Sequence, residues 1–400
     1  MLEKTLFAAS VVVGAALAAV PAAAQAPVKI GILNDQSGTY ADYGGKWSVE
    51  AARMAIEDFG GSALGHKIEL VTADHQNKPD IAASVARRWY ETEGVDMITD
   101  LTTSSVALAV HALSGQLKKV DIVVGAASSE ITGRACQPYG FHWAFDTHAL
   151  AYGTGGTLVE AGGDSWFFLT ADYAFGHQLE HDTGEIVKSR GGKVLGAVRH
   201  PLNNQDYSAF LLQAQASKAK IVGLANAGTD TTNSIKQAAE FGLVAGGQKV
   251  AALLLTLAEV NGLGLNAAQG LVLTESYYWD RNDKSRHFGE RFFARTGRMP
   301  SMIHAGTYSA TLQYLKAVQA AGTKDSDAVV AKLKSMPVDD DIYSGGKVLA
   351  NGRMVHDLYL FEVKKPSESK RPYDYYKLIA TVSGDKAYPS VADSGCKLAH

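Results

Sequence analysis

The hydrophobic pattern of this chain changes period repeatedly, from the alternation of a strand to the three-to-four spacing of a helix. Residues 28–32 alternate between apolar and other side chains, whereas the apolar residues of 46–59 recur at every third or fourth position. Further apolar runs, again separated by helical patterns, lie at 68–73, 95–99 and 120–125. Because such a series builds βαβ units, it predicts an α/β fold with a parallel sheet.

A second series of the same kind runs from the apolar segment 165–169 to the segment 250–255. The chain is therefore predicted to form two similar α/β units in tandem. Later helical patterns at 285–296 and 304–320 need a sheet to cover, and the first unit is the candidate. The tail alternates over 356–382 like two antiparallel strands. A chain that crosses between units more than once has a hinge of several strands, which permits closure about a cleft.

The first 26 residues have the pattern of a cleaved secretory signal peptide. Lys4 precedes an apolar stretch from Leu6 to Val20, and small residues follow up to Ala26. No later segment reaches roughly 18 uninterrupted apolar residues. We therefore expect a periplasmic protein, with a retained membrane anchor as the alternative. The net charge of −3, with scattered basic residues, argues against a nucleic-acid or anionic-lipid partner.

The chain has only two cysteines, Cys136 and Cys396, which lie far apart in the sequence. In an oxidising compartment an even pair predicts a disulfide, which would close a very long loop and hold the C-terminal tail against the body of the protein. Two free thiols are the alternative.

One enzymatic motif stands out, the H-x-x-E-H pattern formed by His177, Glu180 and His181. In some zinc proteases two histidines at this spacing face a metal ion. Its position in the first turns of a predicted surface helix favours ordinary solvated side chains. No phosphate-binding glycine loop, dinucleotide fingerprint or nucleophile elbow is present. We predict no enzyme activity, no cofactor and no metal, with a secreted metallohydrolase using these three residues as an alternative.

Polar and aromatic residues gather where the predicted strands end. The loop after the first strand carries Tyr43. Thr103 and Ser104 follow the strand expected at 95–99, and residues 126–128 follow the strand expected at 120–125. In open α/β sheets ligands bind at the carboxyl ends of the strands, since free amides and helix N-termini converge there. Hydroxyls and free amides suit a carboxylate. Ordinary helix capping is the alternative use of these hydroxyls.

The equivalent strand ends of the second unit carry Tyr173, Phe175, Asn226, Gly228 and Asp230. Tyr173 and Phe175 belong either to the core or to a cleft wall. Beside a glycine-bounded loop a cleft wall is favoured, because aromatic side chains give a large contact area with little loss of entropy. Tyr277 marks a later crossing between units and either closes the same cavity or packs in the hinge.

The mature chain resembles the periplasmic solute-binding proteins of branched-chain amino acid ABC uptake systems, the type I periplasmic binding proteins. The segments that carry the resemblance are 30–38 with Tyr43 and Gly44, 102–105, 125–132, 172–176 and 225–230. The resemblance implies two Rossmann-like lobes with parallel central sheets, joined by a hinge of three crossovers. It also implies a small-molecule ligand held in the cleft by hinge closure, and delivery by a monomer to ABC permease subunits at the inner membrane.

In the amino-acid binders of this family the ligand carboxylate is held at the positions of Thr103 and 126–128, and an aromatic residue at the position of Tyr43 covers the apolar part. The ammonium group is held by a hydroxyl and an acid, where this chain has Ala127 and the run 253–256. An ammonium group buried without a carboxylate would cost several kcal/mol. The missing partner for an ammonium group predicts that the ligand is an aromatic acid of the benzoate or phenylpropenoate type. The segment 136–147 is also similar to that of proteins that bind such acids. A branched-chain or other amino acid is the alternative ligand.

We expect a signal peptide over 1–26, an N-terminal lobe over 27–145 plus 279–350, and a C-terminal lobe over 146–278 plus 351–400. The predicted ligand-binding residues are Tyr43, Thr103, Ser104, Ala126, Ala127, Ser128, Tyr173, Phe175, Asn226, Gly228, Asp230 and Tyr277.

Overall fold

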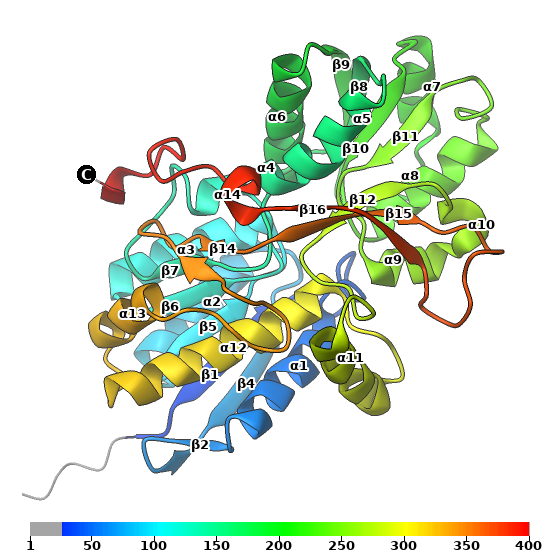
Figure 1. The fold of residues 1–400 in the computed structure, drawn as a ribbon. Helices are drawn as coiled ribbons and strands as arrows, with labels where there is room; N and C mark the ends of the chain where they lie inside the picture. Colours follow the sequence, from blue (N-terminus) through cyan, green and yellow to red (C-terminus); the bar gives the residue numbers. More distant parts are fainter. Residues whose placement is uncertain (1–25, 400) are drawn as a thin grey trace, which may run out of the picture.

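The computed structural model describes residues 26–399 and shows two α/β lobes with a three-stranded sheet running between them (Figure 1). Residues 1–25 of the predicted signal peptide lie outside the described residues. Within the described residues, no helix combines the length and the apolar character needed to cross a membrane.

The first lobe is built on a five-stranded parallel sheet. Its strands, in spatial order, are β4 (Glu69–Asp74), β1 (Lys29–Asn34), β5 (Met97–Asp100), β6 (Val120–Val123) and β7 (Gly140–His142). The connecting helices are α1 (Gly45–Asp58), α2 (Pro79–Glu91) and α3 (Ser104–Leu117), with the short β2 (Ser62–Ala63) and β3 (His66–Lys67) and the turn η1 (Ser129–Ile131). Gly31 in β1 is required by packing, since a Cβ there would lie 2.5 Å from the ring of Trp89 on α2.

Three helices from later in the chain return to cover this sheet, as the sequence predicted. They are α11 (Asp283–Thr296), α12 (Met302–Ala321) and α13 (Ser326–Ser335). The central helix α12 packs along α1 and is buried on nearly every side, which fits its mostly apolar or small residues. Ser301 begins it with a capping hydrogen bond to the Ile303 amide, and Gly322 ends it in the left-handed region at φ 65°.

The second lobe has a four-stranded parallel sheet. Its strands, in spatial order, are β11 (Lys249–Ala252), β10 (Ile221–Ala225), β8 (Ser165–Ala171) and β9 (Lys193–His200). Its helices are α4 (Thr147–Leu150), α5 (Gly156–Glu160), α6 (Ala174–Ser189), α7 (Ser208–Ala216), α8 (Thr229–Glu240), α9 (Leu257–Leu263) and α10 (Leu265–Ala268). A π-helical stretch η2 (Ala151–Gly155) joins α4 to α5, and here Gly153 allows close packing because a Cβ would lie 2.3 Å from the Thr274 hydroxyl.

The chain passes between the lobes at 143–147, 276–282 and 356–358, and its tail returns to the first lobe after β16. The antiparallel sheet between the lobes has the order β12-β15-β16. Its strands are β12 (Val272–Glu275), β15 (Leu358–Val363) and β16 (Tyr376–Val382). The buried Arg353 ties two crossovers together, because its guanidinium donates to the carbonyls of Trp143 and Phe145 and to that of Met354. The fold class predicted from the sequence is confirmed.

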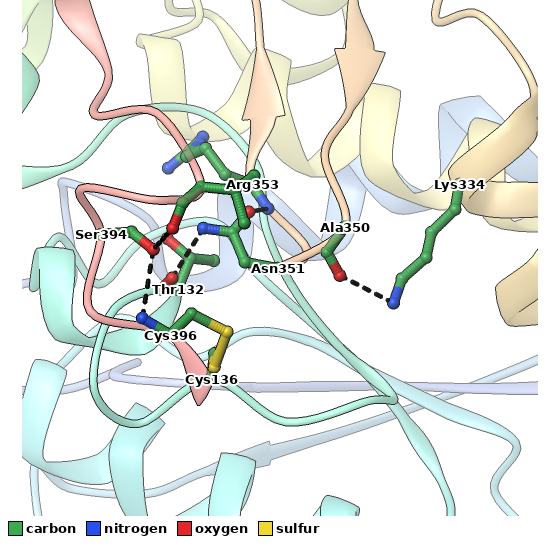
Figure 2. The surroundings of a disulfide bond; sticks show 9 residues. Thr132, Cys136, Lys334, Ala350, Asn351, Arg353, Ser394 and Cys396 are labelled. Atoms are coloured by element: carbon green, nitrogen blue, oxygen red, sulfur yellow. Dashed lines mark hydrogen bonds between the residues drawn. A yellow bond between two sulfur atoms is a disulfide. The ribbon is translucent and has the colours of Figure 1, made fainter. Parts of the chain in front are cut away.

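The Cys136–Cys396 disulfide is present, with the two Cα atoms 5.6 Å apart (Figure 2), so the predicted pairing is confirmed. The tail that follows β16 runs through α14 (Gly384–Ala387) back to the first lobe, where a Cβ on Gly133 would lie 2.8 Å from the Ser394 carbonyl oxygen. The disulfide therefore attaches the tail to the first lobe and not to the second.

The residues around 353 also contact the first lobe. They form the hairpin β13 (Lys347–Val348) and β14 (Met354–Val355), and Arg353 bridges in parallel to His142 of β7. Asn351 donates from Nδ2 to the Thr132 carbonyl at 2.8 Å (Figure 2). The residue boundaries of the two lobes stay a prediction. The contacts of 351–355, and those of the tail at 394–396, are with the first lobe, although the whole range 351–400 was expected in the second.

Candidate functional site

A cavity lies between the two lobes at the carboxyl ends of both parallel sheets. Its ten lining residues are Tyr40, Tyr43, Thr102, Ser104, Gly125, Ala127, Tyr173, Phe175, Ala227 and Leu254. The empty space is about 190 Å³. This figure includes space that is open to solvent, so the closed cavity itself is smaller.

Asp35 shapes the loop that carries the two tyrosines of the first-lobe wall. Its carboxylate accepts hydrogen bonds from the amides of Gly38 at 2.7 Å and Tyr40 at 2.9 Å, and from Asn77 Nδ2 at 2.6 Å. Carboxylates that accept several backbone bonds hold a turn in one conformation. The loop after β1 is therefore a fixed part of the cavity wall.

Tyr43 is buried in this wall, and its role of covering the ligand stays a prediction. Its hydroxyl donates to the Gly125 carbonyl at 3.1 Å, and its ring lies 5.7 Å from that of Tyr40. Burial raises the pKa of the Tyr43 phenol well above its ordinary value, so the group keeps its proton at neutral pH.

The N-terminus of α3 and the loop after β6 form a polar corner of the cavity. Ser104 lines it, and the Ser104 hydroxyl accepts from the Ser128 amide at 3.2 Å. The Ser128 hydroxyl is fully buried and has no hydrogen-bond partner among the described residues. A buried hydroxyl beside the free amides of a helix N-terminus is suited to hold a carboxylate.

Thr103 has a different position from the one expected of a ligand contact. Its hydroxyl donates to the Asn77 side-chain oxygen, and Asn77 in turn donates to Asp35. The hydroxyl that lines the corner beside Ser104 is that of Thr102, which accepts from the Asp35 amide at 3.1 Å. Thr103 therefore positions the loop after β1, and its neighbours face the cavity.

The second-lobe wall is aromatic and aliphatic. Tyr173 is the N-cap residue of α6, and its ring lies 5.9 Å from that of Phe175. Ala227 and Leu254 come from the ends of β10 and β11. Leu254 lies in the run 253–256 and adds an aliphatic side chain to this wall.

The lobes touch each other directly across the cavity mouth. The hydroxyls of Tyr40 and Tyr173 lie 2.5 Å apart, and the Thr229 amide donates to the Thr39 carbonyl at 3.3 Å. Gly228 has φ 62°, and a Cβ there would lie 2.5 Å from the Thr39 oxygen, so only glycine allows this approach. The structure is thus the closed form of the cleft.

Three predicted site residues have their side chains elsewhere. The Asn226 amide bonds to His200, Thr231 and Ser234 inside the second lobe. The Asp230 carboxylate accepts from the amides of residues 203 and 204 and from the Tyr207 hydroxyl, all at 2.9–3.0 Å. The Tyr277 hydroxyl donates to the Ser285 carbonyl on α11, which is the hinge-packing alternative.

Sequence reasoning left five lining residues out of the site, namely Tyr40, Thr102, Gly125, Ala227 and Leu254. All five lie in or next to segments already assigned to strand ends. Their place near a strand end could therefore have identified them from the sequence. The direction of each side chain could not be predicted in this way.

The H-x-x-E-H motif does not converge on one point. Glu180 accepts from the Thr170 hydroxyl at 2.6 Å and from Arg199 at 3.1 Å, while His177 bonds to Asp172 at 2.8 Å. Within the described part of the chain no group of three or more His, Cys, Asp or Glu side chains is placed to hold a metal ion.

Asp100 lies beneath the cavity floor, in contact with residues that line it. It is fully buried at φ 75°, accepts from Asn34 Nδ2 at 2.8 Å, and its other oxygen has no partner among the described residues. Burial raises the pKa of this carboxyl to about 6. A non-glycine residue in this backbone region is strained, and such strain is frequent next to binding sites.

Comparison with known proteins gives a consistent result. A family model described as periplasmic binding protein matches residues 27–370. A periplasmic binding protein from Burkholderia mallei is 52% identical, with a TM-score of 0.92, over 94% of this chain and 99% of that one. A branched-chain amino acid ABC transporter periplasmic ligand-binding protein from Burkholderia xenovorans is 39% identical, with a TM-score of 0.83, over 93% and 99% of the two chains.

More distant proteins share the same architecture. The Leu/Ile/Val-binding protein homolog 6 of Brucella melitensis is 26% identical over 354 residues, 85% of this chain and 88% of that protein. An ABC-transporter solute-binding protein from Rhodopseudomonas palustris, solved with 3,4-dihydroxybenzoic acid, is 24% identical with a TM-score of 0.81 over 90% and 98% of the chains. A leucine-binding protein from Thermotoga maritima is 20% identical with a TM-score of 0.78 over 90% and 99%. The last two show the fold alone.

All of these proteins are described as binding proteins and not as enzymes, and a family of periplasmic proteins implies an extracytoplasmic location. The fold that the sequence predicted, two parallel-sheet lobes closing on a cleft, is the one these structures share. Since the family model covers most of its length, this chain belongs to the periplasmic binding protein family.

Proposed function

We propose that this protein is the extracytoplasmic binding component of an ABC uptake transporter and that its ligand is an aromatic monocarboxylate. One observation carries the proposal: among the described residues, none of the ten that line the cavity has a charged side chain, and four of them are aromatic, namely Tyr40, Tyr43, Tyr173 and Phe175. An α-amino acid would bring an ammonium group into this space without a carboxylate to pair it, at a cost of several kcal/mol.

Two acidic groups that follow the strand ends of the second lobe are already engaged. Asp230 accepts three hydrogen bonds from its own lobe. Glu259, which follows the run 253–256, closes a capping box on α9, where it accepts from the Thr256 amide at 2.7 Å. Burial raises the pKa of the Glu259 carboxyl, which further disfavours a charged role there. Leu254 occupies the wall itself.

A ligand carboxylate needs hydrogen-bond donors, and the first lobe offers them. The Ser104 and Thr102 hydroxyls face the polar corner, and the buried Ser128 hydroxyl is available to donate. The α3 N-terminus adds its free amides and the positive end of the helix dipole. An aromatic acid would place its ring between the aromatic side chains of the two walls.

The transport role rests on the family and on the closed cleft. In a carrier the ligand contacts both lobes only when they are closed, and it thereby shifts the hinge equilibrium toward a form that permease subunits can recognise. A monomer is sufficient for this task, and we include it in the proposal together with delivery to an inner-membrane permease.

Calorimetry on the purified protein tests the ligand class. Benzoate, 4-hydroxybenzoate and coumarate are titrated in parallel with leucine and valine. We expect binding of at least one aromatic acid and none of the amino acids. Binding of leucine or valine together with no heat from the three aromatic acids would refute the proposal.

A further inference from the structure

The closest contact between the lobes at the cavity is a pair of phenols from opposite walls. Tyr40 belongs to the loop after β1, and Tyr173 caps α6. Their hydroxyl oxygens lie 2.5 Å apart, and within the described part of the chain neither hydroxyl has another hydrogen-bond partner. Both residues line the cavity. The pair is thus formed by closure and faces the ligand space.

Counting protons shows that this pair is incomplete. Each phenol has one O–H donor, and burial raises the pKa of both groups, so both keep their protons at neutral pH. The bond between them uses one donor. The second donor remains without an acceptor from the protein, and an unsatisfied donor in an apolar, largely buried place is unfavourable.

The other lining groups of the cavity leave this task to the ligand. The Tyr43 hydroxyl is already bonded to the Gly125 carbonyl at 3.1 Å. Phe175 and Leu254, which complete the same side of the wall, have no polar side-chain atoms. The free phenolic proton is therefore available to an acceptor on a bound molecule.

The tyrosine pair and the polar corner lie on different sides of the cavity. The corner is formed after β5 and β6, whereas Tyr40 follows β1, which lies on the other side of β5 in the sheet. A ligand whose carboxylate occupies the corner would extend its far end toward the tyrosine pair. The two polar sites are then used by opposite ends of one small molecule.

We propose that the Tyr40–Tyr173 pair is a specificity element that donates a hydrogen bond to an oxygen at the end of the ligand opposite its carboxylate. This inference rests on the proposed function. The ligand class it names is an aromatic acid with an oxygen in the para position, such as a 4-hydroxy or 4-methoxy acid, and unsubstituted or alkyl-substituted acids bind less well.

The test compares two ligands of similar size, 4-hydroxybenzoate and 4-methylbenzoate, of which only the first has an acceptor at the far end. For the unmodified protein we expect 4-hydroxybenzoate to bind about tenfold more tightly, since leaving a donor unsatisfied costs roughly one hydrogen bond. The Tyr40→Phe/Tyr173→Phe double variant removes both donors, and we expect the ratio of the two dissociation constants to fall to about one or below.

The ratio is the chosen readout because losing the contact between the lobes weakens both ligands alike. Tyr375→Phe is the matched control, since it removes a phenol hydroxyl that bonds to Asn261 at 3.0 Å away from the cavity lining, and it should leave the ratio unchanged. Circular dichroism and thermal melting confirm that each variant is folded.

The outcomes separate this inference from the proposed function. Equal affinity for the two acids in the unmodified protein, or an unchanged ratio in the double variant, would overturn the role of the tyrosine pair and leave aromatic-acid binding intact. Binding of leucine with no binding of either benzoate would overturn both.

Discussion

Replacing Asp100 by asparagine should stabilise the protein at neutral pH and remove part of its pH dependence. The carboxyl is fully buried, has one hydrogen bond to Asn34 and leaves its second oxygen unpaired among the described residues. Burial raises its pKa to about 6 from an ordinary value near 3.8. The folded state therefore binds this proton more tightly than the unfolded state, so stability falls as the pH rises from about 4 to 6.

The size of the effect follows from the two pKa values. The raised pKa of Asp100 lowers the free energy of unfolding by about 3 kcal/mol at pH 7 and by about 1.6 kcal/mol at pH 5, relative to low pH where the carboxyl is protonated in both states. The asparagine side chain would carry no charge at either pH. The stability gained by Asp100→Asn should therefore be about 1.3 kcal/mol larger at pH 7 than at pH 5.

Urea unfolding followed by circular dichroism at pH 7 and pH 5 measures this difference. Glu290→Gln is the matched control, because it makes the same carboxylate-to-amide change at an exposed position of α11. Its effect on the free energy of unfolding should be close to zero at both pH values. If the gain from Asp100→Asn were the same at pH 5 as at pH 7, the assignment of a raised pKa to Asp100 would be wrong.

Three further changes probe the cleft and the tail. Leu254→Asp places a negative charge in the cavity wall and should lower the affinity for aromatic acids by at least about tenfold in calorimetry. The uncharged, similarly sized Leu254→Asn should lower it less, and equal losses of affinity would count against the charge argument. Gly228→Ala forces a Cβ toward the Thr39 oxygen in a left-handed conformation, so small-angle scattering with saturating ligand should show an open form, and an unchanged radius would contradict it. Reducing the Cys136–Cys396 bond should lower the free energy of urea unfolding by about 2–5 kcal/mol, and no change on reduction would mean that the tail contributes nothing to stability.

The strands and helices follow closely from periodicity because each depends on local pattern. The helix expected at 304–320 is α12, Met302–Ala321, and the strand expected at 165–169 is β8, Ser165–Ala171. The largest differences are at strand ends, where the expected run 250–255 became the shorter β11, Lys249–Ala252. Pairing with β10 stops there, and the rest of that apolar run enters the cavity wall and the cap of α9.

The site was less accessible to sequence reasoning, because a strand end predicts where a residue lies but not where its side chain points. Asp230 lies in the first turn of α8, after β10, and its carboxylate turns to the amides of 203 and 204, a contact that depends on a distant loop. Thr103 turns to Asn77 for the same reason. The sequence predicted a ligand contact for Tyr43 but not for Tyr40. In the structure both rings line the cavity, because the turn held by Asp35 brings them there together.

Closure and recognition depend on the same residues in this cleft. Tyr173, Phe175 and Leu254 can contact a ligand held by the first lobe only after the lobes have closed. A ligand shifts the hinge equilibrium by no more than its difference in affinity for the two forms. Direct hydrogen bonds between the lobes already contribute to closure, among them those through Tyr40 and Thr229 and that from the Ser129 hydroxyl to Asp182, each worth about 0.5–1.5 kcal/mol. The remaining drive has to come from contacts with the second-lobe wall, so a ligand that fits this uncharged aromatic surface poorly would bind to the open form and fail to close it.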